Sequence, residues 1–261
     1  MKLNQAQIDL FERQGFLLLP ELFSLPEVEV LRSALTPLFV EKDEANVCEK
    51  LSGEVRTAMG LHTRSETYDR LVHHPRLLEP ALQLLGDGLY AQQVKVNIKA
   101  AFEGEAWQWH YDFATHHRED GVPKPLALNL HVFLDDVSEF NGPLYFIPGS
   151  HRYGPAPAEL DTVSTSYPLW VVDRDTVAKL AGAHGMISAT GRAGTALIFG
   201  DCLVHASPPN LSPWNRRIFS LIANPIANAQ TTFARPDYKH HRDFAALVPF
   251  ADDCLIEATA A

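Results

Sequence analysis

The sequence of 261 residues predicts a mainly β protein with flanking helices, built as a double-stranded β-helix, the cupin-like jelly roll of two packed sheets. Helical patterns come first along the chain, and several strand-like runs follow from about residue 90 onward. Turns that contain Gly, Pro or Asn separate those runs, which favours a sandwich or barrel over a fold of alternating strands and helices. We expect one domain over residues 1–261, with the helices on one outer face.

The N-terminal third of the chain is expected to hold three helices and one strand. Ser24 and Glu27 have the spacing of a capping box, and Pro26 suits the first turn of the helix that follows. Gly15 and Gly86 are placed where a helix would end. The expected elements are a helix over 4–13, a strand over 16–19, a helix from 24 to about 39 and a helix over 76–86.

Strand-forming residues dominate the rest of the chain. Runs rich in β-branched, aromatic and aliphatic side chains lie at 90–100, 127–135, 143–147, 195–199 and 217–224. Between two of these runs lies a long segment, residues 153–185, that contains Trp170 and several prolines. Segments of this length are often active-site lids, and an ordinary surface excursion is the alternative.

The composition limits the classes of partner. Hydrophobic residues make up 46% of the chain and charged residues 21%, as in ordinary globular proteins. A net charge of −10 argues against nucleic acid, since phosphate binding needs clustered Lys and Arg, but it says little about the substrate. The N-terminal residues lack the features of a signal peptide, and the apolar run 16–19 is too short to cross a membrane. We therefore expect a cytoplasmic protein that binds no membrane; no pattern indicates its oligomeric state.

The three cysteines do not form a recognisable pattern. Cys48, Cys202 and Cys254 are widely spaced, and the chain has no Cys-x-x-Cys pair. Neither a disulfide framework nor a cysteine zinc site is therefore supported.

His110, Asp112 and His205 are the candidate metal ligands. Residues i and i+2 of a strand point to the same face, so His110 and Asp112 can reach one ion. His205 follows the predicted strand 195–199 and would have to come from another strand. Two imidazoles and one carboxylate, with open positions opposite, are the ligands of non-heme Fe(II) oxygenases. A catalytic zinc site can use the same residue types, so these ligands alone do not select the metal.

A second signal lies downstream of His205. Ser207 follows it closely, and Arg216 stands at the start of a predicted strand, where its guanidinium could grip a carboxylate with two hydrogen bonds. A keto acid that chelates Fe(II) needs such a cation for its outer carboxylate. The alternative is that Arg216 is a surface cation. Adjacent His240 and His241 are expected to be a solvated pair.

Three blocks of sequence, taken together, resemble one enzyme family. The blocks are WHYDFATHHREDGVP at 109–123, NGPLYFIPGSH at 141–151 and HASPPNLSPWNR at 205–216. They are similar to the phytanoyl-CoA dioxygenase superfamily of Fe(II)/2-oxoglutarate-dependent oxygenases. The closest resemblance is to the branch that holds ectoine hydroxylases and hydroxylases of free amino acids. It extends from about Phe16 to Asn224.

The resemblance implies a role for each matching residue. Fe(II) would be held by His110, Asp112 and His205, and the cosubstrates would be 2-oxoglutarate and O2. The cosubstrate 2-oxoglutarate would be bound by Arg216, Ser207, Asn97 and Thr115. The substrate pocket would be lined by Gln93, Trp107, His116 and Trp170. Gln93, Asn97 and Lys99 alternate along one strand face, as a pocket wall should, whereas Trp107 could equally pack in the core.

One departure from the branch bears on the substrate. Ectoine hydroxylases carry a Trp where this chain has His116, and an aromatic wall suits the cyclic ectoine cation. We therefore expect a hydroxylase of a small free amino acid, such as proline, pipecolate or an aliphatic amino acid. Asp112 favours hydroxylation over halogenation, because related halogenases lack the carboxylate ligand. The alternatives are an ectoine or other natural-product hydroxylase, a zinc hydrolase, and an inactive barrel that only binds a small molecule.

Overall fold

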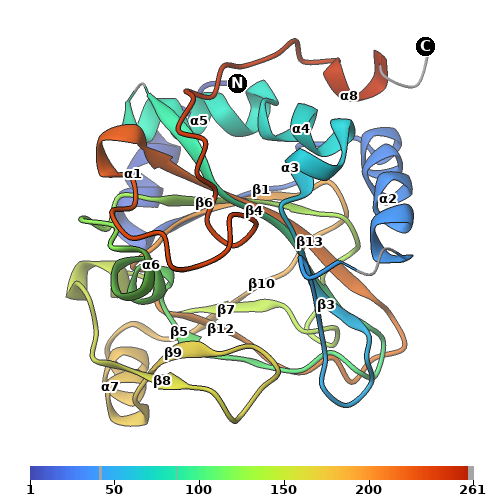
Figure 1. Ribbon diagram of the computed structural model, residues 1–261. Helices are drawn as coiled ribbons and strands as arrows, with labels where there is room; N and C mark the ends of the chain where they lie inside the picture. Colours follow the sequence, from blue (N-terminus) through green and yellow to red (C-terminus); the bar gives the residue numbers. More distant parts are fainter. Residues whose placement is uncertain (41–42, 87, 258–261) are drawn as a thin grey trace.

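The computed structural model describes residues 1–40, 43–86 and 88–257, and two antiparallel sheets form its centre (Figure 1). The larger sheet has seven strands, and its middle strand β13 pairs with β6 on one side and with β4 on the other. In spatial order its strands are β1 (Phe16–Leu19), β11 (Ala196–Gly200), β6 (Leu128–Phe133), β13 (Arg216–Pro225), β4 (Leu89–Lys99), β3 (Val55–Met59) and β2 (Asn46–Cys48).

The smaller sheet has six strands and lies below the larger one in Figure 1. Its central pair, β12 and β5, is antiparallel, and β7 and β9 flank that pair. In spatial order the strands are β10 (Ile187–Ala189), β7 (Leu144–Phe146), β12 (His205–Ser207), β5 (Trp107–His110), β9 (Leu169–Val172) and β8 (Ala158–Asp161).

Helices cover the outer face of the seven-stranded sheet, at the top of Figure 1. These are α1 (Gln5–Gln14), α2 (Leu25–Val40), α3 (Leu61–Arg64), α4 (Glu66–Val72) and α5 (Pro75–Leu85). The others are α6 (Asp112–Asp120), α7 (Arg174–His184), α8 (Cys254–Glu257) and the 3-10 turns η1 (Ser150–Tyr153) and η2 (Ile226–Asn228). None of the helices in the described ranges is long and apolar enough to span a bilayer.

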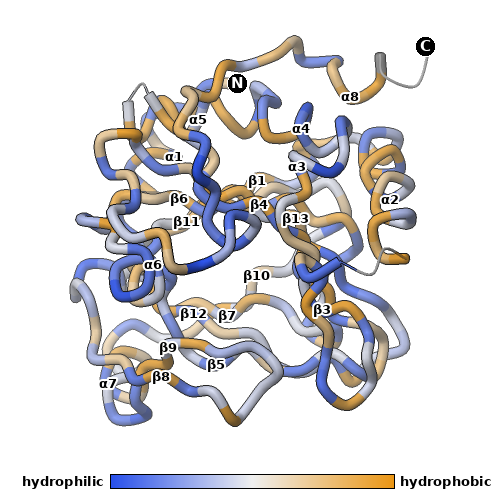
Figure 2. Tube along the Cα trace, viewed as in Figure 1, coloured by the Kyte–Doolittle hydropathy of each residue, from blue (hydrophilic) through white to orange (hydrophobic). Residues whose placement is uncertain are grey.

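Side-chain alternation along the strands divides the interior into two parts. On β13, Phe219 and Leu221 face the helices and pack with Leu31 and Tyr68, whereas Ile218 faces the space between the sheets. Apolar residues accordingly run along the strands of both sheets (Figure 2). Because helices cover one face of the central strands of the seven-stranded sheet, the other face of these strands is left to line an internal cavity.

The jelly roll with helices on one outer face is confirmed, and the long predicted elements lie within one or two residues of β1, β4, β6, β7, β11, β13, α1 and α5. The two N-terminal caps are also present: Asn4 and Gln7 form a capping box at α1, and the Ser24 N–H donates to Glu27 at 2.7 Å before α2. The segment 153–185 contains β8, β9 and α7, and its role as an active-site lid stays a prediction.

Candidate active site

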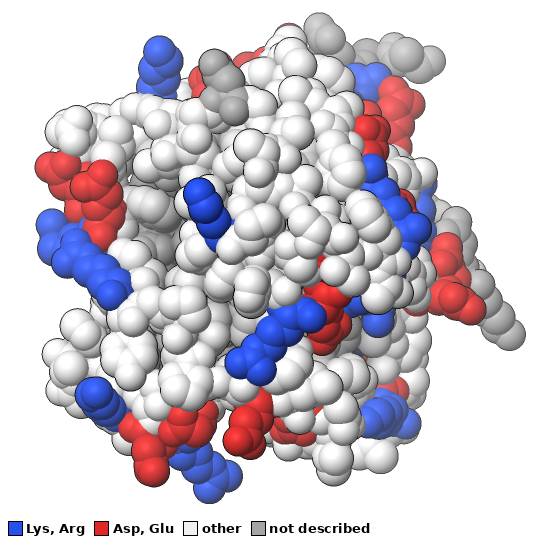
Figure 3. All heavy atoms as spheres, turned by 60° about the vertical axis from the view of Figure 1, so that its left-hand side comes forward, with Lys and Arg blue, Asp and Glu red and all other residues white. Residues whose placement is uncertain are grey.

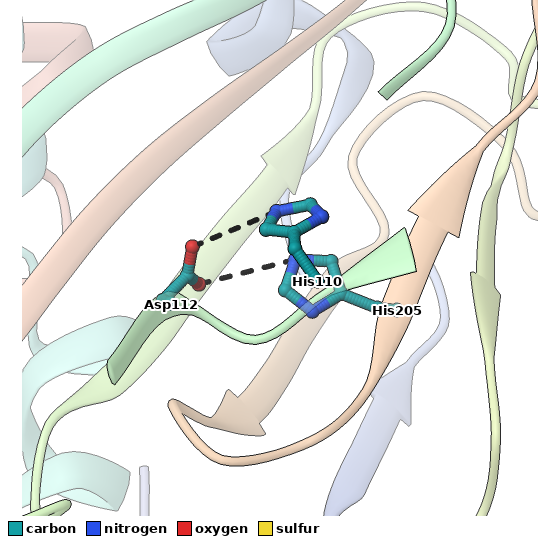
Figure 4. Close-up of side chains that lie close together, drawn as sticks. All are labelled: His110, Asp112 and His205. Carbon is teal, nitrogen blue, oxygen red and sulfur yellow. Dashed lines mark ion pairs between the residues drawn. The ribbon is translucent and has the colours of Figure 1, made fainter. Parts of the chain in front are cut away.

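Three side chains from two neighbouring strands and one helix converge at the mouth of the barrel. His110 ends β5, His205 begins β12, and the two residues are direct cross-strand partners. The chain leaves β5 after His110, so Asp112 starts α6 instead of continuing the strand. Its oxygens lie 3.8 Å from Nε2 of His110 and 3.9 Å from Nε2 of His205 (Figure 4). One ligand atom from each residue lies within 4.8 Å of the others, which is close enough to share an ion.

Hydrogen bonds orient each of these ligands. Nδ1 of His110 lies 2.6 Å from the Gln108 carbonyl, and Nδ1 of His205 lies 2.8 Å from the Leu203 carbonyl. A carbonyl can only accept, so both rings carry their hydrogen on Nδ1 and present the Nε2 lone pair to Asp112. The side-chain amide of Asn129 donates to Oδ2 of Asp112 at 2.8 Å. Such outer contacts fix ligand geometry in metal sites.

The electrostatics keep the ligands in the protonation states that bind a cation. Burial, followed by the neighbouring His205, lowers the pKa of His110 to about 3, so this ring is neutral at physiological pH. Burial alone would raise the pKa of Asp112, but His205 and His110 outweigh it and hold that pKa below its usual range. A neutral imidazole and an ionised carboxylate are what a divalent metal requires.

Arg216 lies deeper in the same cavity as a buried cation. Its Nε donates to the Gly142 carbonyl at 3.1 Å, and one terminal nitrogen lies 3.4 Å from the Ser207 hydroxyl. No carboxylate of the described residues pairs with Arg216. Burial, followed by the neighbouring Arg56 cation, lowers the pKa of Arg216 to about 9, and Asp135 opposes this shift only in part. A buried guanidinium without a counter-ion indicates a binding place for an anion.

A single cavity joins the ligand triplet to Arg216. Ten of the eleven predicted site residues line it, namely Gln93, Asn97, Trp107, His110, Asp112, Thr115, His116, His205, Ser207 and Arg216. Trp107 therefore faces the cavity instead of being sealed in the core, while the Arg56 guanidinium covers its ring 4.0 Å from the centroid.

Trp170 is the predicted site residue that the structure places elsewhere. It lies on β9, and its indole N–H donates to Glu119 at 3.1 Å. The guanidinium of Arg118 stacks on its ring, 4.2 Å from the centroid, so Trp170 packs against α6. Lys99 also points away from the cavity, since its ammonium donates to the carbonyls of Glu105 and Pro208.

Several cavity residues escaped the sequence prediction. Among them are Lys95, Asn129, His131, Tyr167 and Arg235. Lys95 could have been found, because it alternates with Gln93 and Asn97 along β4. Arg235 lies in an irregular segment after β13, where no periodicity applies.

Arg235 is fixed by a buried ionic network at the cavity mouth. Its guanidinium donates to both oxygens of Asp120, and Nδ1 of His240 lies 2.7 Å from the same carboxylate. The expectation that His240 is a solvated residue is therefore wrong: it is 1% exposed, and its Nε2 lies 3.2 Å from the Tyr90 hydroxyl. The irregular segment thus returns to the barrel and contributes to the site.

The surface carries charges of both signs. On the face shown in Figure 3, the Lys and Arg side chains of the described residues are scattered and mixed with Asp and Glu. A stripe of like positive charge, the usual footprint for phosphate backbones, does not form on that face of the described structure.

Comparison with known proteins places this site in a family. Residues 11–218 match the family model described as "Phytanoyl-CoA dioxygenase (PhyH)". The L-proline trans-4-hydroxylase of Streptomyces griseoviridis is 37% identical over 94% of this chain and 95% of its own length. The ectoine dioxygenase of Bordetella bronchiseptica is 38% identical over 87% of this chain and 77% of its own.

A solved structure agrees with the same assignment. EctD from S. alaskensis with bound Fe superposes with a TM-score of 0.84 at 33% identity and covers 95% of this chain and 87% of its own. The same enzyme with 2-oxoglutarate and 5-hydroxyectoine gives a TM-score of 0.82 at 33% identity, with 94% and 86% covered. The chain therefore belongs to the phytanoyl-CoA dioxygenase family. It is an Fe(II)/2-oxoglutarate-dependent dioxygenase, and its cofactor and cosubstrates are those of that class, Fe(II), 2-oxoglutarate and O2.

Proposed function

We propose that this enzyme hydroxylates a small free amino acid, with L-proline or a related cyclic imino acid as the preferred substrate. The reaction converts the amino acid, 2-oxoglutarate and O2 into the hydroxylated amino acid, succinate and CO2. The observation that carries this proposal is the cavity that joins three metal ligands to the buried Arg216, which pairs with no carboxylate of the described residues. The match to an L-proline trans-4-hydroxylase along nearly the whole of both chains supports the substrate class.

The residues present fit a bound Fe(II). His110, Asp112 and His205 offer two imidazole nitrogens and one carboxylate oxygen close together, the donor set that would hold Fe(II) and leave room for exchangeable ligands. When bound, iron with 2-oxoglutarate supplies the activation of O2 that C–H hydroxylation needs. The protein's part is to hold the ligands, place the substrate C–H bond beside them and exclude water.

The residues also fit 2-oxoglutarate. Arg216 would bind the distal carboxylate with its fork of donors, because only an anion compensates its buried charge. The Ser207 hydroxyl and the Arg216 Nε both contact the Gly142 carbonyl, so the clamp is already assembled. Asn97 and Thr115 complete the wall on this side of the cavity.

The cavity also holds groups that suit a zwitterion. Arg235 supplies a cation for the substrate carboxylate, and Trp107 supplies an aromatic surface for its ammonium group. Gln93 and His116 add polar groups, and Nδ1 of His116 has no hydrogen-bond partner in the described structure. Trp170 would act indirectly, through its contacts with Arg118 and Glu119 on α6. We place the reaction in the cytoplasm, where free amino acids and 2-oxoglutarate are available.

Ectoine is the second candidate substrate, because ectoine dioxygenases and EctD are similar to this chain over most of its length. His116 argues against it, since a buried imidazole replaces the Trp that ectoine hydroxylases carry. The test is a mass-spectrometric panel of L-proline, pipecolate, aliphatic amino acids and ectoine with Fe(II), ascorbate and 2-oxoglutarate. We expect the largest gain of one oxygen with L-proline or pipecolate. Ectoine as the best substrate would overturn the preference for an amino acid.

A further inference from the structure

Tyr167 closes the cavity from the loop between β8 and β9, the hairpin at the lower edge of Figure 1. Its ring lies 5.3 Å from the ring of Trp107, and both rings line the cavity that contains the metal ligands. Its hydroxyl makes no hydrogen bond to any described residue. A phenol that faces a binding cavity with a free donor is suited to contact a ligand.

An ionic latch holds this loop in place. The backbone N–H and the hydroxyl of Ser166 each donate to the Glu105 carboxylate at 2.6 Å. Glu105 in turn pairs with Arg56 at 3.2 Å, and Arg56 is the cation that covers the Trp107 ring. Hydrogen bonds and an ion pair therefore connect Ser166, through Glu105 and Arg56, to the Trp107 ring that Tyr167 faces. These contacts hold Tyr167 in place although its loop is irregular.

Tyr167 and Arg235 act on the same region of the cavity. Both side chains line the cavity that contains the metal ligands. Burial raises the pKa of the Tyr167 phenol, and the Arg235 cation opposes this rise in part. The phenol is accordingly a hydrogen-bond donor at neutral pH. Arg235 is already engaged with Asp120, which leaves it limited freedom to surround an anion alone.

We propose that Tyr167 is a specificity-determining residue whose hydroxyl donates to the substrate carboxylate beside Arg235, with Ser166 and Glu105 as positioning residues. This inference rests on the proposed function, because it requires a substrate with a carboxylate. It assigns the recognition of a small amino acid to a loop outside the metal and 2-oxoglutarate residues. A hydrogen bond to a charged group predicts a loss of about tenfold in affinity when the donor is removed.

The experiment compares Tyr167→Phe with the wild-type enzyme loaded with Fe(II) and 2-oxoglutarate without O2. The dissociation constant of L-proline is measured by calorimetry, and the KM for 2-oxoglutarate is measured separately in air. Tyr153→Phe is the matched control, since Tyr153 is exposed on η1 and does not line the cavity. We expect about tenfold weaker proline binding in Tyr167→Phe, an unchanged KM for 2-oxoglutarate, and no change in Tyr153→Phe.

A second pair of variants tests whether the hydrogen bonds from Ser166 to Glu105 position Tyr167. Ser166→Ala should raise the KM for proline more than it changes kcat, and Ser166→Thr, which keeps the hydroxyl, should restore it. Proline affinity in Tyr167→Phe equal to that of the wild type overturns the role of Tyr167 and leaves the proposed function intact. If the wild type binds no amino acid of the panel and instead hydroxylates a compound without a carboxylate, the proposed function fails and this inference fails with it.

Discussion

The two ends of the cavity are built differently. At the metal and 2-oxoglutarate end, His110, His205 and Arg216 stand on paired strands, and backbone carbonyls fix all three side chains. At the substrate end, Tyr167 and Arg235 stand on irregular segments, and carboxylate side chains hold those segments.

This difference indicates that one set of residues supports the oxidation chemistry and another set selects the substrate. Strand register fixes the positions of His110, His205 and Arg216, and Asp112 starts the helix that follows β5, so that end is rigid. Loops with ionic latches can change residue by residue without disturbing the barrel, as expected where specificity varies among enzymes of one fold. Substitutions at the first end should therefore abolish turnover, and those at the second should change which substrate is accepted.

The largest effect is expected from His110→Ala. Loss of one imidazole should remove most bound Fe(II) and abolish succinate formation with any substrate, because too few ligands hold the ion. Iron content after desalting, measured by mass spectrometry of the metal, and succinate yield check this. His184→Ala is the control, since His184 lies at the end of α7 outside the cavity. Retained iron and turnover in His110→Ala would contradict the assignment.

Arg216→Gln should come next. Removal of one partner of a buried charge pair costs at least about 2 kcal/mol, so the KM for 2-oxoglutarate should rise at least about 30-fold. Arg217→Gln is the matched control, because Arg217 points to the opposite face of β13 and pairs with Asp135 at 2.7 Å. Equal KM values for the two variants would show that Arg216 does not bind the cosubstrate.

Arg235→Gln tests the other end. We expect the KM for the amino acid to rise about tenfold, the scale of a lost charge-assisted hydrogen bond, while the KM for 2-oxoglutarate stays constant. Initial-rate kinetics with each compound varied in turn check this, and Arg235→Lys should recover part of the loss. A rise in the KM for 2-oxoglutarate instead would place Arg235 at the wrong end of the cavity.

The smallest effect is expected from Asp120, the carboxylate that pairs with Arg235. Burial would raise the pKa of Asp120, but its hydrogen bonds to His240 and Arg235 lower it to about 2, from an ordinary 3.8. A lowered pKa in the folded state stabilises the fold above pH 3.8, and this contribution is lost as the pH falls toward 2. Urea midpoints should therefore fall over this window by more in the wild type than in Asp120→Asn. Parallel curves would contradict the role of this carboxylate.

The sequence predicted the strand-built end far better than the loop-built end. His110, Ser207 and Arg216 stand on strands, where strand periodicity places them without knowledge of distant contacts. Asp112 reaches the site for another reason than the predicted one, since it starts α6 instead of continuing the strand. Lys95 was within reach of the same argument, since it shares a strand face with Gln93.

Strand periodicity could not predict Arg235 and Tyr167 as site residues, for a physical reason. Each reaches the cavity through tertiary contacts with residues far along the chain, such as Asp120 for Arg235 and Glu105 for Ser166, and no local period encodes such contacts. His240 illustrates the same limit, because only the fold shows that Asp120 and Tyr90 bury it.

The most direct test of the central claim is turnover of L-proline under 18O2 with Fe(II) and 2-oxoglutarate, followed by mass spectrometry. We expect hydroxyproline with one labelled oxygen, formed in equal amount with succinate. Succinate without an oxygenated amino acid, for any amino acid of the panel, would contradict it.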